Sequence, residues 1–569
     1  MILNDLNQIL LNSIEQYAKS KSIEINLELK KQINFEISSD SARGDYASSC
    51  CLKLSKLFGL SPRDLANDLK PTIADDRIVD LKIEGPGFIN VFISAEQKYY
   101  ALKELIKASD DWGKTDQCSG KILLEFVSSN PTGPLHVGHG RGAVLGMAIA
   151  NLLEQIGYTV TKEYYVNDAG RQISILTSSV ILNAYVNNFE SDGTYEGDYI
   201  KGLASEFKQN HGDLKNEIIL EGLDDDKDKR LDDISSYLQT NFKDTWDKAR
   251  NFSVERILEI IKKDLHSFNI IHDVWFKESS LGKAADLSSD LYKSIKIINE
   301  EGHTFEKDGA QWFKTTAFGD DKDRVLLREN GEPTYYLTDV GYHKNKIDRE
   351  FDHYINIFGA DHHGYIPRLT SAFNVLKKDT QKIEFLLYQL VNLYEEGIKK
   401  MMSTRKGEFY SLSDLRDELG PDVIKFFFLE KKSDHAMDFD MDLAKDESKN
   451  NPYFYAQYAH VRCCSILSKA NYDPNKPIDL AELDNCFEII SKATNYPIFI
   501  KEYAVERSPH SLVHFIKEFS AAFHSFYERS PVITEDEVVS NSRLLITKVT
   551  KQILKNSFKI LNVEPLEKM

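Results

Sequence analysis

The sequence predicts an α/β protein in which a central parallel sheet carries an insertion and lies between a small α+β domain and an all-α bundle. Apolar β-rich runs alternate with helical periodicity from about residue 113 to residue 450, which is the pattern of a parallel sheet. Before this stretch, two β-rich runs surround a glycine turn near residue 86, which predicts a hairpin. From residue 451 onward helical periodicity dominates.

Composition limits the class of protein. A chain of 569 residues with 41% hydrophobic residues can build several domains with sizeable cores. No apolar run approaches the length of a membrane span, and the N-terminus is acidic where a signal peptide would be basic, so we expect a cytoplasmic protein without membrane contact. The six cysteines lack the spacing of a metal site or a disulfide framework, which predicts no dedicated structural metal.

The net charge of −18 is at first sight unfavourable for binding a polyanion. Residues 451–569, however, hold 14 basic and 14 acidic side chains, so the acidic excess lies entirely before them. Within this neutral part four lysines recur at helical spacing: Lys548, Lys551, Lys555 and Lys559. This stripe suits either RNA phosphates or a plain solvated helix face.

The most informative motif follows the first predicted strand of the sheet, residues 121–127. His136-Val137-Gly138-His139 opens a helix, so two imidazoles stand at a helix N-terminus. Unpaired N–H groups and a partial positive charge there suit phosphate, and each imidazole can donate a hydrogen bond to developing charge. The motif predicts a nucleotide triphosphate site formed by Pro134, Leu135, His136, Val137, Gly138, His139 and Gly140.

Two other kinds of protein share parts of this motif. Residues 138–143 match G-x-G-x-x-A, but in a dinucleotide-binding fold the first glycine follows the strand at once, whereas here a loop intervenes. An H-x-G-H tetrapeptide also occurs in small-molecule nucleotidylyltransferases, so it does not by itself name the substrate.

Two further segments extend the predicted site. Residues 399–407 form a basic, glycine-ended loop that suits phosphates, with Met402, Ser403, Arg405 and Lys406. Gly359, Asp361 and His362 follow the apolar run 354–358, at the sheet edge where open α/β folds bind ligands. Asp361, His362 and His363 also admit a divalent-metal site, although no further ligand cluster with suitable spacing is visible.

Together these motifs resemble arginyl-tRNA synthetases, a family of class I synthetases. The histidine motif resembles the class's HIGH sequence, and residues 401–407 resemble KMSKS in the form M-S-T-R-K-G. The segments V-N-D-A-G-R-Q at 166–172, G-A-D-H-H-G-Y at 359–365 and G-P-G-F-I-N at 85–90 are similar to family motifs in the same order. The resemblance implies the Rossmann-like HUP fold.

The resemblance also implies domains and a reaction. Residues 1–112 are expected to meet the outer corner of tRNA, 113–450 to form the catalytic domain with a helical insertion at about 193–307, and 451–569 to bind the anticodon. The implied enzyme is a monomer. It activates L-arginine with ATP and Mg²⁺ and transfers it to tRNA(Arg), releasing AMP and pyrophosphate.

Site residues carry over position by position. The implied catalytic residues are His136, His139, Ser403, Arg405 and Lys406. Carboxylates suit a guanidinium because it is a fixed cation with five donors, and the implied arginine pocket is Glu125, Asn130, Tyr335, Asp339 and His362. Aromatic and basic groups suit unpaired bases and phosphates, and the expected tRNA contacts are Tyr453, Tyr458, Arg462, Lys551 and Lys555.

The basic loop departs from its family pattern. Met401 and Thr404 stand where KMSKS has lysines, so another cation must assist the leaving pyrophosphate. The candidates are Lys400, Lys406 and the upstream Lys121, with Arg405. We expect Lys406 with Arg405 to do so, because Lys121 begins a strand and lies at the wrong end of the sheet. A catalytically inactive RNA-binding paralogue therefore stays open beside the nucleotidylyltransferase.

Overall fold

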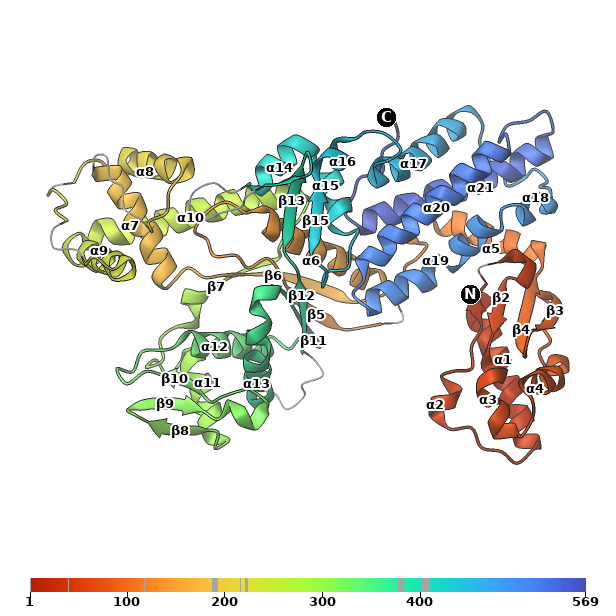
Figure 1. Cartoon of the computed structure of the whole chain (residues 1–569), viewed down its shortest axis with the longest axis horizontal. Helices are drawn as coiled ribbons and strands as arrows, with labels where there is room; N and C mark the ends of the chain where they lie inside the picture. The colour runs from red at the N-terminus through yellow and green to blue at the C-terminus, as the bar shows by residue number, and fades with distance from the viewer. Residues whose placement is uncertain are drawn as a thin grey trace.

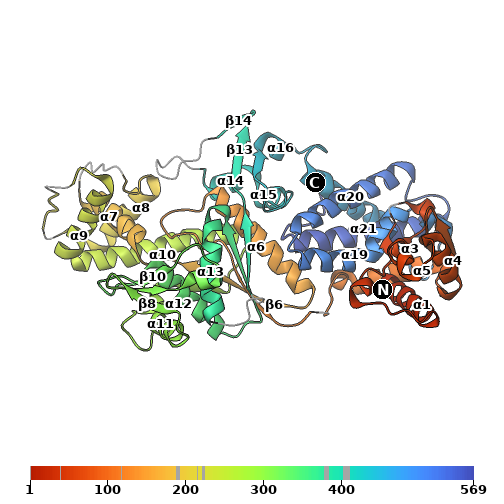
Figure 2. The same cartoon turned by 60° about the horizontal axis from the view of Figure 1, so that its bottom comes forward.

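The computed structural model of the whole chain describes residues 2–38, 40–116, 118–186, 193–214, 216–220, 224–376, 383–400 and 410–569. The molecule is elongated (Figures 1 and 2). A parallel sheet lies in the middle, a group of helices projects from one side of it, and the C-terminal helices extend from the other. The N-terminal module is attached at the far end of that helical bundle (Figure 1).

The central sheet has the order β12-β11-β5-β6-β7, and all four pairings are parallel. Its strands are β5 (Lys121–Glu125), β6 (Thr159–Val166), β7 (Val274–Lys277), β11 (His353–Gly359) and β12 (Ile383–Tyr388). The strand of this sheet that comes first in the chain, β5, is thus its middle strand, and the order reverses between β5 and β11. Open α/β sheets bind ligands outside the carboxyl ends of the strands at such a reversal. The predicted parallel sheet is confirmed.

The strand β5 ends at Glu125, two residues earlier than predicted. Val127 and Ser128 have φ angles of 70° and 42°, which turn the chain sharply out of the sheet. A left-handed conformation is strained for non-glycine residues, above all for β-branched valine. The apolar side chain of Val127 made it look like strand, but its backbone belongs to the turn.

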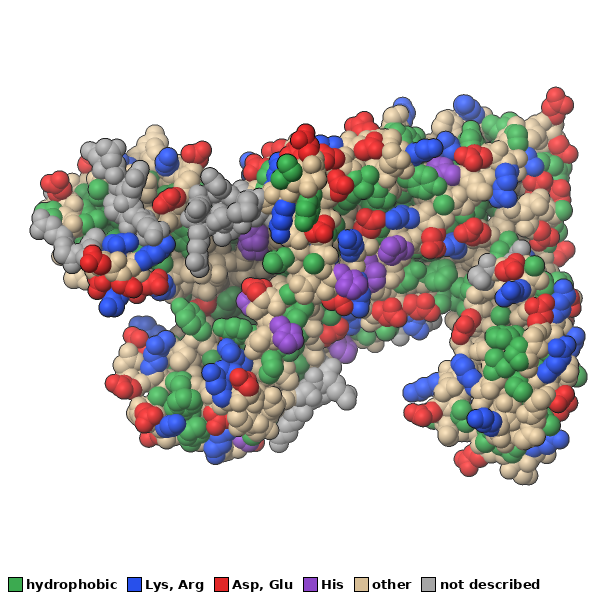
Figure 3. All heavy atoms as spheres, in the orientation of Figure 1, with side chains coloured by type: hydrophobic (Ala, Val, Ile, Leu, Met, Phe, Trp, Pro, Cys, Tyr) green, Lys and Arg blue, Asp and Glu red, His purple; other side chains and the backbone are tan. Residues whose placement is uncertain are grey.

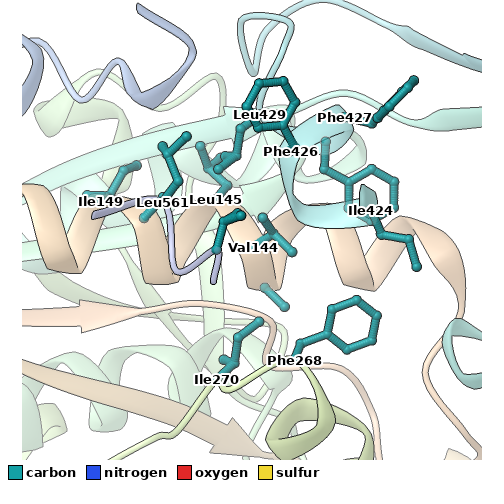
Figure 4. Close-up of a cluster of buried hydrophobic side chains, with 14 of the residues drawn as sticks. Val144, Leu145, Ile149, Phe268, Ile270, Ile424, Phe426, Phe427, Leu429 and Leu561 are labelled. Carbon is teal, nitrogen blue, oxygen red and sulfur yellow. The ribbon is translucent and has the colours of Figure 1, made fainter. Parts of the chain in front are cut away.

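The helix α6 (Val137–Gln155) crosses the sheet and is the centre of the main core. Its Val144, Leu145 and Ile149 meet apolar side chains from distant parts of the chain, as Figure 4 shows: Phe268, Ile270, Ile424, Phe426, Phe427, Leu429 and Leu561. Gly142 and Gly146 permit this packing, because a Cβ there would lie 2.6 Å from Tyr388 and 2.3 Å from Phe126.

The range predicted as a helical insertion, residues 193–307, begins with the helices α8 (Asp198–His211), α9 (Lys227–Asn241) and α10 (Lys243–Ser267). The helix α7 (Arg171–Tyr185) precedes this range, and a further helix, Asp290–Glu300, lies near its end. After α10 the chain returns to the main sheet as β7, within the range expected to be inserted. A strand of four residues is too short to reveal itself by periodicity among charged helices.

Beyond β7 a second module leads to the other half of the sheet. It comprises α11 (Asp290–Glu300), a small antiparallel sheet of β8 (Thr304–Lys307), β9 (Ala310–Phe313) and β10 (Arg324–Leu327), and α12 (Tyr335–Asp348). The 3-10 helix η6 (Ala360–Tyr365) and α13 (Ile366–Leu376) follow β11. A further sheet pairs β13 (Val391–Glu395) with β14 (Ile398–Lys399) and β15 (Met437–Asp440), beside α14 (Leu412–Leu419), α15 (Pro421–Phe428) and α16 (Met441–Lys445).

The N-terminal module has an antiparallel sheet of order β1-β2-β4-β3 and a hydrophobic core of its own. The predicted hairpin is confirmed as β3 (Ile78–Glu84) and β4 (Phe88–Ile93). Its helices α1 (Ile2–Ser20), α3 (Cys50–Phe58) and α4 (Pro62–Leu69) cover the sheet, with β1 (Glu36–Ile37) and β2 (Tyr46–Ser48) completing it. The helix α5 (Ala95–Ala108) leads from the module to the central sheet.

The predicted C-terminal all-α bundle is confirmed. It consists of α17 (Pro452–Lys469), α18 (Leu480–Asp484), α19 (Phe487–Val505), α20 (Pro509–Arg529) and α21 (Glu537–Ile560). Its buried side chains belong to the same continuous cluster as those of α6 and the central sheet. None of the helices in the described ranges is long and apolar enough to cross a membrane.

Candidate active site

The two histidines of the first motif cap the helix α6. The Nδ1 atom of His136 accepts a hydrogen bond from the backbone N–H of His139 at 3.3 Å, and the Nδ1 atom of His139 accepts one from His136 at 3.4 Å. Their rings stack with centroids 3.6 Å apart. This reciprocal arrangement satisfies two backbone donors at the helix start, as a capping box does.

Both imidazoles are neutral. Burial lowers the pKa of His136, and burial lowers the pKa of His139 to about 3, with a smaller contribution from the neighbouring imidazole of His136. Because Nδ1 accepts in each ring, the single proton of each neutral imidazole is on Nε2. The site therefore offers two N–H donors beside the positive end of a helix dipole.

Two glycines of the motif have close neighbours. A Cβ on Gly138 would lie 3.0 Å from the ring of His136, so glycine leaves room for the stacked pair. A Cβ on Gly140 would lie 2.5 Å from Leu412, so glycine here allows α14 to pack against α6. Pro134, Leu135 and Val137 complete the turn into the helix; Leu135 and Val137 are buried.

The chain just after the basic loop, residues 399–407, contacts the histidine motif. The backbone N–H of Leu412 donates to the carbonyl of Leu135 at 2.8 Å, and Ser411 forms a β-bridge with His136. The expected phosphate-binding residues Met402, Ser403, Arg405 and Lys406 lie outside the described residues. The structure thus describes the chain on both sides of residues 401–409, and its downstream side touches the histidine motif.

Two other cations were considered for the pyrophosphate. Lys400 forms an ion pair with Glu395. Lys121 begins β5, at the end of the sheet opposite to Glu125, and its backbone N–H donates to Asp352 at 2.8 Å. Lys400 is thus paired with a carboxylate, and Lys121 lies at the end of β5 that is far from the histidines.

Arg141 fastens the same region from the inside. Its side chain is 1% exposed and donates to three backbone carbonyls, those of Gln389 at 2.8 Å, His435 at 2.9 Å and Lys432 at 3.1 Å. Burial lowers the pKa of its guanidinium to about 10. The first two carbonyls belong to the loops that precede β13 and β15, so one buried cation ties both strands to α6.

A row of polar side chains crosses the sheet at the level of Glu125. Asn356 of β11, Glu125 of β5 and Glu163 of β6 are neighbours in register, and all three are buried. The helix α12 supplies their partners from successive turns. Lys346 donates to Glu125 and to Asn356, and Arg349 pairs with Glu163.

Glu125 is consequently already engaged. One oxygen accepts from the hydroxyl of Ser128 at 2.9 Å, and the other accepts from Lys346 and from Tyr342 at 3.2 Å. A buried carboxylate needs such partners, because an unpaired charge in the interior is strongly unfavourable. Because Lys346 neutralises Glu125, a cationic ligand would have to pair with another carboxylate.

Asp339 is the carboxylate that remains free. It lies on α12 one turn after Tyr335, and among the described residues its carboxylate has neither a hydrogen-bond nor an ion-pair partner. Burial raises its pKa to about 7, helped by the negative charges of Glu278 and Glu125. Nearby Arg368 and Lys346 offset only part of this effect. The arrangement favours an added cation.

Glu278 and Tyr165 belong to the same site and were missed in the sequence. The phenol of Tyr165 donates to Glu278 at 2.7 Å, and burial raises the pKa of Glu278. Glu278 directly follows β7, within the range expected to be a helical insertion, so no motif identified it. A signal was present in the short apolar run before it, Val274-Trp275-Phe276.

The remaining predicted substrate residues lie on the surface around this centre. Tyr335 is 60% exposed and lies near Gly170, and Asn130 is exposed in the loop after β5. Gly359 ends β11, and Asp361 and His362 of η6 are exposed, 3.7 Å apart. No cluster of three or more metal-ligating side chains is formed by the described residues.

The residues expected to meet tRNA divide into buried and exposed ones. Tyr453 is 4% exposed and packs against Phe426 and Phe454, which is a core position. Tyr458 is 36% exposed, and the guanidinium of Arg462 lies 4.5 Å from the ring of Tyr527. A base can stack only on the exposed members of this group.

The basic stripe of α21 has partners inside the protein. Asp110, between α5 and β5, accepts from Lys555 at 2.8 Å and from Lys559 at 2.9 Å, and these lysines hold the pKa of Asp110 well below its ordinary range. Lys551 lies 3.6 Å from Glu567. The stripe therefore helps to join the N-terminal linker to the bundle.

Comparisons with known families cover nearly the whole chain. The model described as the catalytic domain of class I (R) tRNA synthetases matches residues 102–446. The arginyl tRNA synthetase N terminal domain matches residues 4–93, and the DALR anticodon binding domain matches residues 456–569.

Individual proteins agree with these matches. The arginine--tRNA ligase of Vesicomyosocius okutanii is 39% identical over 98% of both chains, and that of Hydrogenovibrio crunogenus is 37% identical over 99% of both. A crystal structure titled putative arginyl t-RNA synthetase from Campylobacter jejuni is 30% identical, covers 84% of this chain and 100% of its own, and has a TM-score of 0.71. The arginyl-tRNA synthetase of Thermus thermophilus shares the fold over 100% of both chains, with 20% identity and a TM-score of 0.77. With identity of this extent and all three domains in the same order, the chain belongs to the arginyl-tRNA synthetases.

Proposed function

We propose that the chain is an arginine–tRNA ligase whose two substrate pockets meet at the carboxyl ends of β5 and β11. The observation that carries this proposal is the carboxylate of Asp339, which has no hydrogen-bond or ion-pair partner among the described residues and lies near Glu278 and Glu125. A guanidinium is a permanent cation with several donors and would relieve the repulsion among these carboxylates. The adjoining histidine-capped helix supplies the phosphate side of the reaction.

In this proposal the arginine side chain is recognised mainly by its positive charge. Its guanidinium pairs with Asp339, and Glu278 adds a second acceptor that Tyr165 orients. Glu125, held by Lys346, contributes its field and shapes the pocket wall. Tyr335, Asn130 and His362 close the pocket from the surface.

The chemical step joins the arginine carboxylate to the α-phosphorus of ATP. A carboxylate oxygen attacks that phosphorus, the bond to the bridging oxygen breaks, and pyrophosphate leaves with its electron pair. The Nε2–H groups of His136 and His139 would donate to the phosphate oxygens as negative charge builds on them. Gly359, Asp361 and the residues around Gly138 would form the walls of the nucleotide pocket. Mg²⁺ would accompany the ATP phosphates as part of the substrate.

The second half of the reaction uses tRNA(Arg). The terminal ribose hydroxyl attacks the activated carbonyl, AMP leaves, and arginyl-tRNA is formed. Tyr458 and Arg462 on the exposed side of α17 are the proposed contacts to unpaired anticodon bases. A cytoplasmic monomer is part of the same proposal, supported by the family resemblance.

Arginine-dependent exchange of pyrophosphate into ATP, measured with and without tRNA, tests this function. We expect exchange with arginine and none with lysine, because the pocket presents acceptors for a planar fork of donors. A nucleotidylyltransferase would show no dependence on the amino acid. An inactive paralogue would bind tRNA and show no exchange under any condition.

A further inference from the structure

A groove of about 400 Å³ lies at the joint between the catalytic domain and the C-terminal bundle. One wall comes from α6 and β12, and the other from the loop after α15 and from the start of α20. A second hollow of about 660 Å³ continues it and shares Lys431, Lys432 and His510. None of these residues belongs to the substrate pockets described above.

The walls of this groove are basic in a protein with a net charge of −18. Arg141, Lys431, Lys432 and Arg507 line it against two acids, Asp434 and Glu506. Lys432 pairs with Asp434 at 3.0 Å, whereas Lys431 is exposed and forms no ion pair with any described residue. The space-filling view shows histidine and basic side chains gathered near the middle of one face (Figure 3).

The positive charges of Arg141 and Arg507 are only partly neutralised. Among the described residues, Arg141 is held by carbonyl oxygens alone and has no carboxylate partner. Arg507 pairs with Glu384 at 3.2 Å, but its buried Nε atom has no partner in the described part of the chain. Together with Lys431 they leave an excess of positive charge at the groove, which suits an anion.

The position of the groove identifies the anion. Arg141 follows His136 by five residues on α6, which places it about 7.5 Å further along the helix axis. Ile366, another lining residue, directly follows η6 and its Asp361. The opposite wall is the start of α20, in the part of the chain that matches an anticodon binding domain. The groove therefore lies at the junction of the catalytic domain and the part of the chain that matches the anticodon binding domain, and one tRNA must reach both parts.

We propose that this groove binds the phosphodiester backbone of the tRNA where it passes from the bundle to the catalytic edge. The inference rests on the proposed function and adds a contact surface to it. Lys431 and Lys432 meet phosphates directly, and Arg141 contributes its charge from beneath. Such contacts position the RNA without reading its sequence.

The test reverses two charges in the full-length protein. Lys431→Glu combined with Lys432→Glu should raise the Kd for tRNA at least tenfold in low salt. The slope of log affinity against log salt concentration should fall by about 1.5, because roughly 0.7–0.9 counterions are released per neutralised phosphate. Lys296→Glu on α11, outside the groove, is the matched control and should leave both quantities unchanged.

One companion variant and one binding measurement separate charge from folding. Lys431→Arg with Lys432→Arg keeps the cations and should restore affinity and slope. Arginine binding by calorimetry, measured on every variant, reports the integrity of the substrate pocket. An unaltered tRNA affinity and salt slope in the charge-reversed protein would overturn the groove. Failure of the wild-type protein to charge tRNA with arginine would instead overturn the proposed function.

Discussion

The geometry of the histidine pair assigns each ring nitrogen a separate task. Nδ1 closes the helix start and leaves Nε2–H available, so in the proposed mechanism one side chain serves both folding and chemistry. Alanine at either position loses both roles, whereas asparagine keeps a capping oxygen.

Replacement of either histidine should therefore slow activation more than it weakens binding. We expect His136→Asn or His139→Asn to raise the barrier to adenylate formation by roughly 2–4 kcal/mol, because the lost donor acts on transition-state charge. Rapid-quench measurement of adenylate, with arginine affinity measured in parallel, checks this. Wild-type rates in a folded variant would remove the histidines from the mechanism.

Asp339 predicts a pH dependence. Its pKa of about 7 belongs to the free enzyme, and a guanidinium pairs with the ionised form. As the pH falls below 7 the carboxylate takes up a proton, so the Kd for arginine should rise by about tenfold per pH unit. The effect must vanish at higher pH, where Asp339 is already ionised.

Calorimetric titration of arginine from pH 8 to pH 5.5 measures this profile. Asp339→Asn should weaken arginine binding and flatten the profile, while ATP affinity changes little. Glu278, Glu125, Arg368 and Lys346 also act on this carboxyl group, so Glu278→Gln should lower the pH at which binding is lost. Equal losses for arginine and ATP in Asp339→Asn would contradict the pocket.

The choice of cation for the pyrophosphate is a further prediction at this scale. Lys406→Ala should slow adenylate formation strongly with little change in ATP affinity. Lys121→Ala should be nearly silent, because Lys121 lies at the opposite end of β5. Single-turnover kinetics on both variants decide the matter, and the reverse pattern would transfer the role to Lys121.

At the scale of elements, α12 contacts the sheet through polar side chains on successive turns. Tyr342, Lys346 and Arg349 project from successive turns onto the buried carboxylates of β5 and β6. The same helix carries Asp339 on the next turn toward its start. The ion pairs beneath thus fix the height and rotation of the helix that carries Asp339.

Removal of the central ammonium group should be costly. Lys346→Met leaves Glu125 and Asn356 buried without their shared donor, and we expect a loss of about 3–5 kcal/mol in the free energy of unfolding. Lys344→Met is the matched control on the same helix, since its pair with the exposed Asp348 should contribute less than about 1 kcal/mol. Chemical denaturation of both variants measures the difference. A cost below about 1 kcal/mol for Lys346→Met would show that water solvates the row.

The sequence was informative about these elements where a motif or a period was long. Residues 160–166, the hairpin around Gly85-Pro86-Gly87 and the helix from Val137 were all predicted from pattern. The pairing of α12 with the sheet was not, because it depends on the register of distant strands. Glu278 escaped for a related reason: a lone acid after a short strand has no local pattern to identify it.

At the scale of the whole molecule, the order of domains was predictable and their joints were not. The stripe of lysines on α21 was expected to face RNA or solvent, yet Lys555 and Lys559 meet Asp110. Helical periodicity shows which side chains share a face but not what lies opposite. The groove beside Lys431 was invisible for the same reason, since its walls are far apart in sequence.

Thermal unfolding of this chain should proceed in fewer cooperative steps than the chain has domains. The N-terminal module encloses a core of its own, so it is able to melt as an independent unit. The catalytic sheet and the C-terminal helices, by contrast, share one unbroken set of buried side chains that runs from β5 through α6 to α21. A weakened contact anywhere along this set loosens both, so the machinery that activates arginine and the helices that hold the anticodon gain or lose their order together.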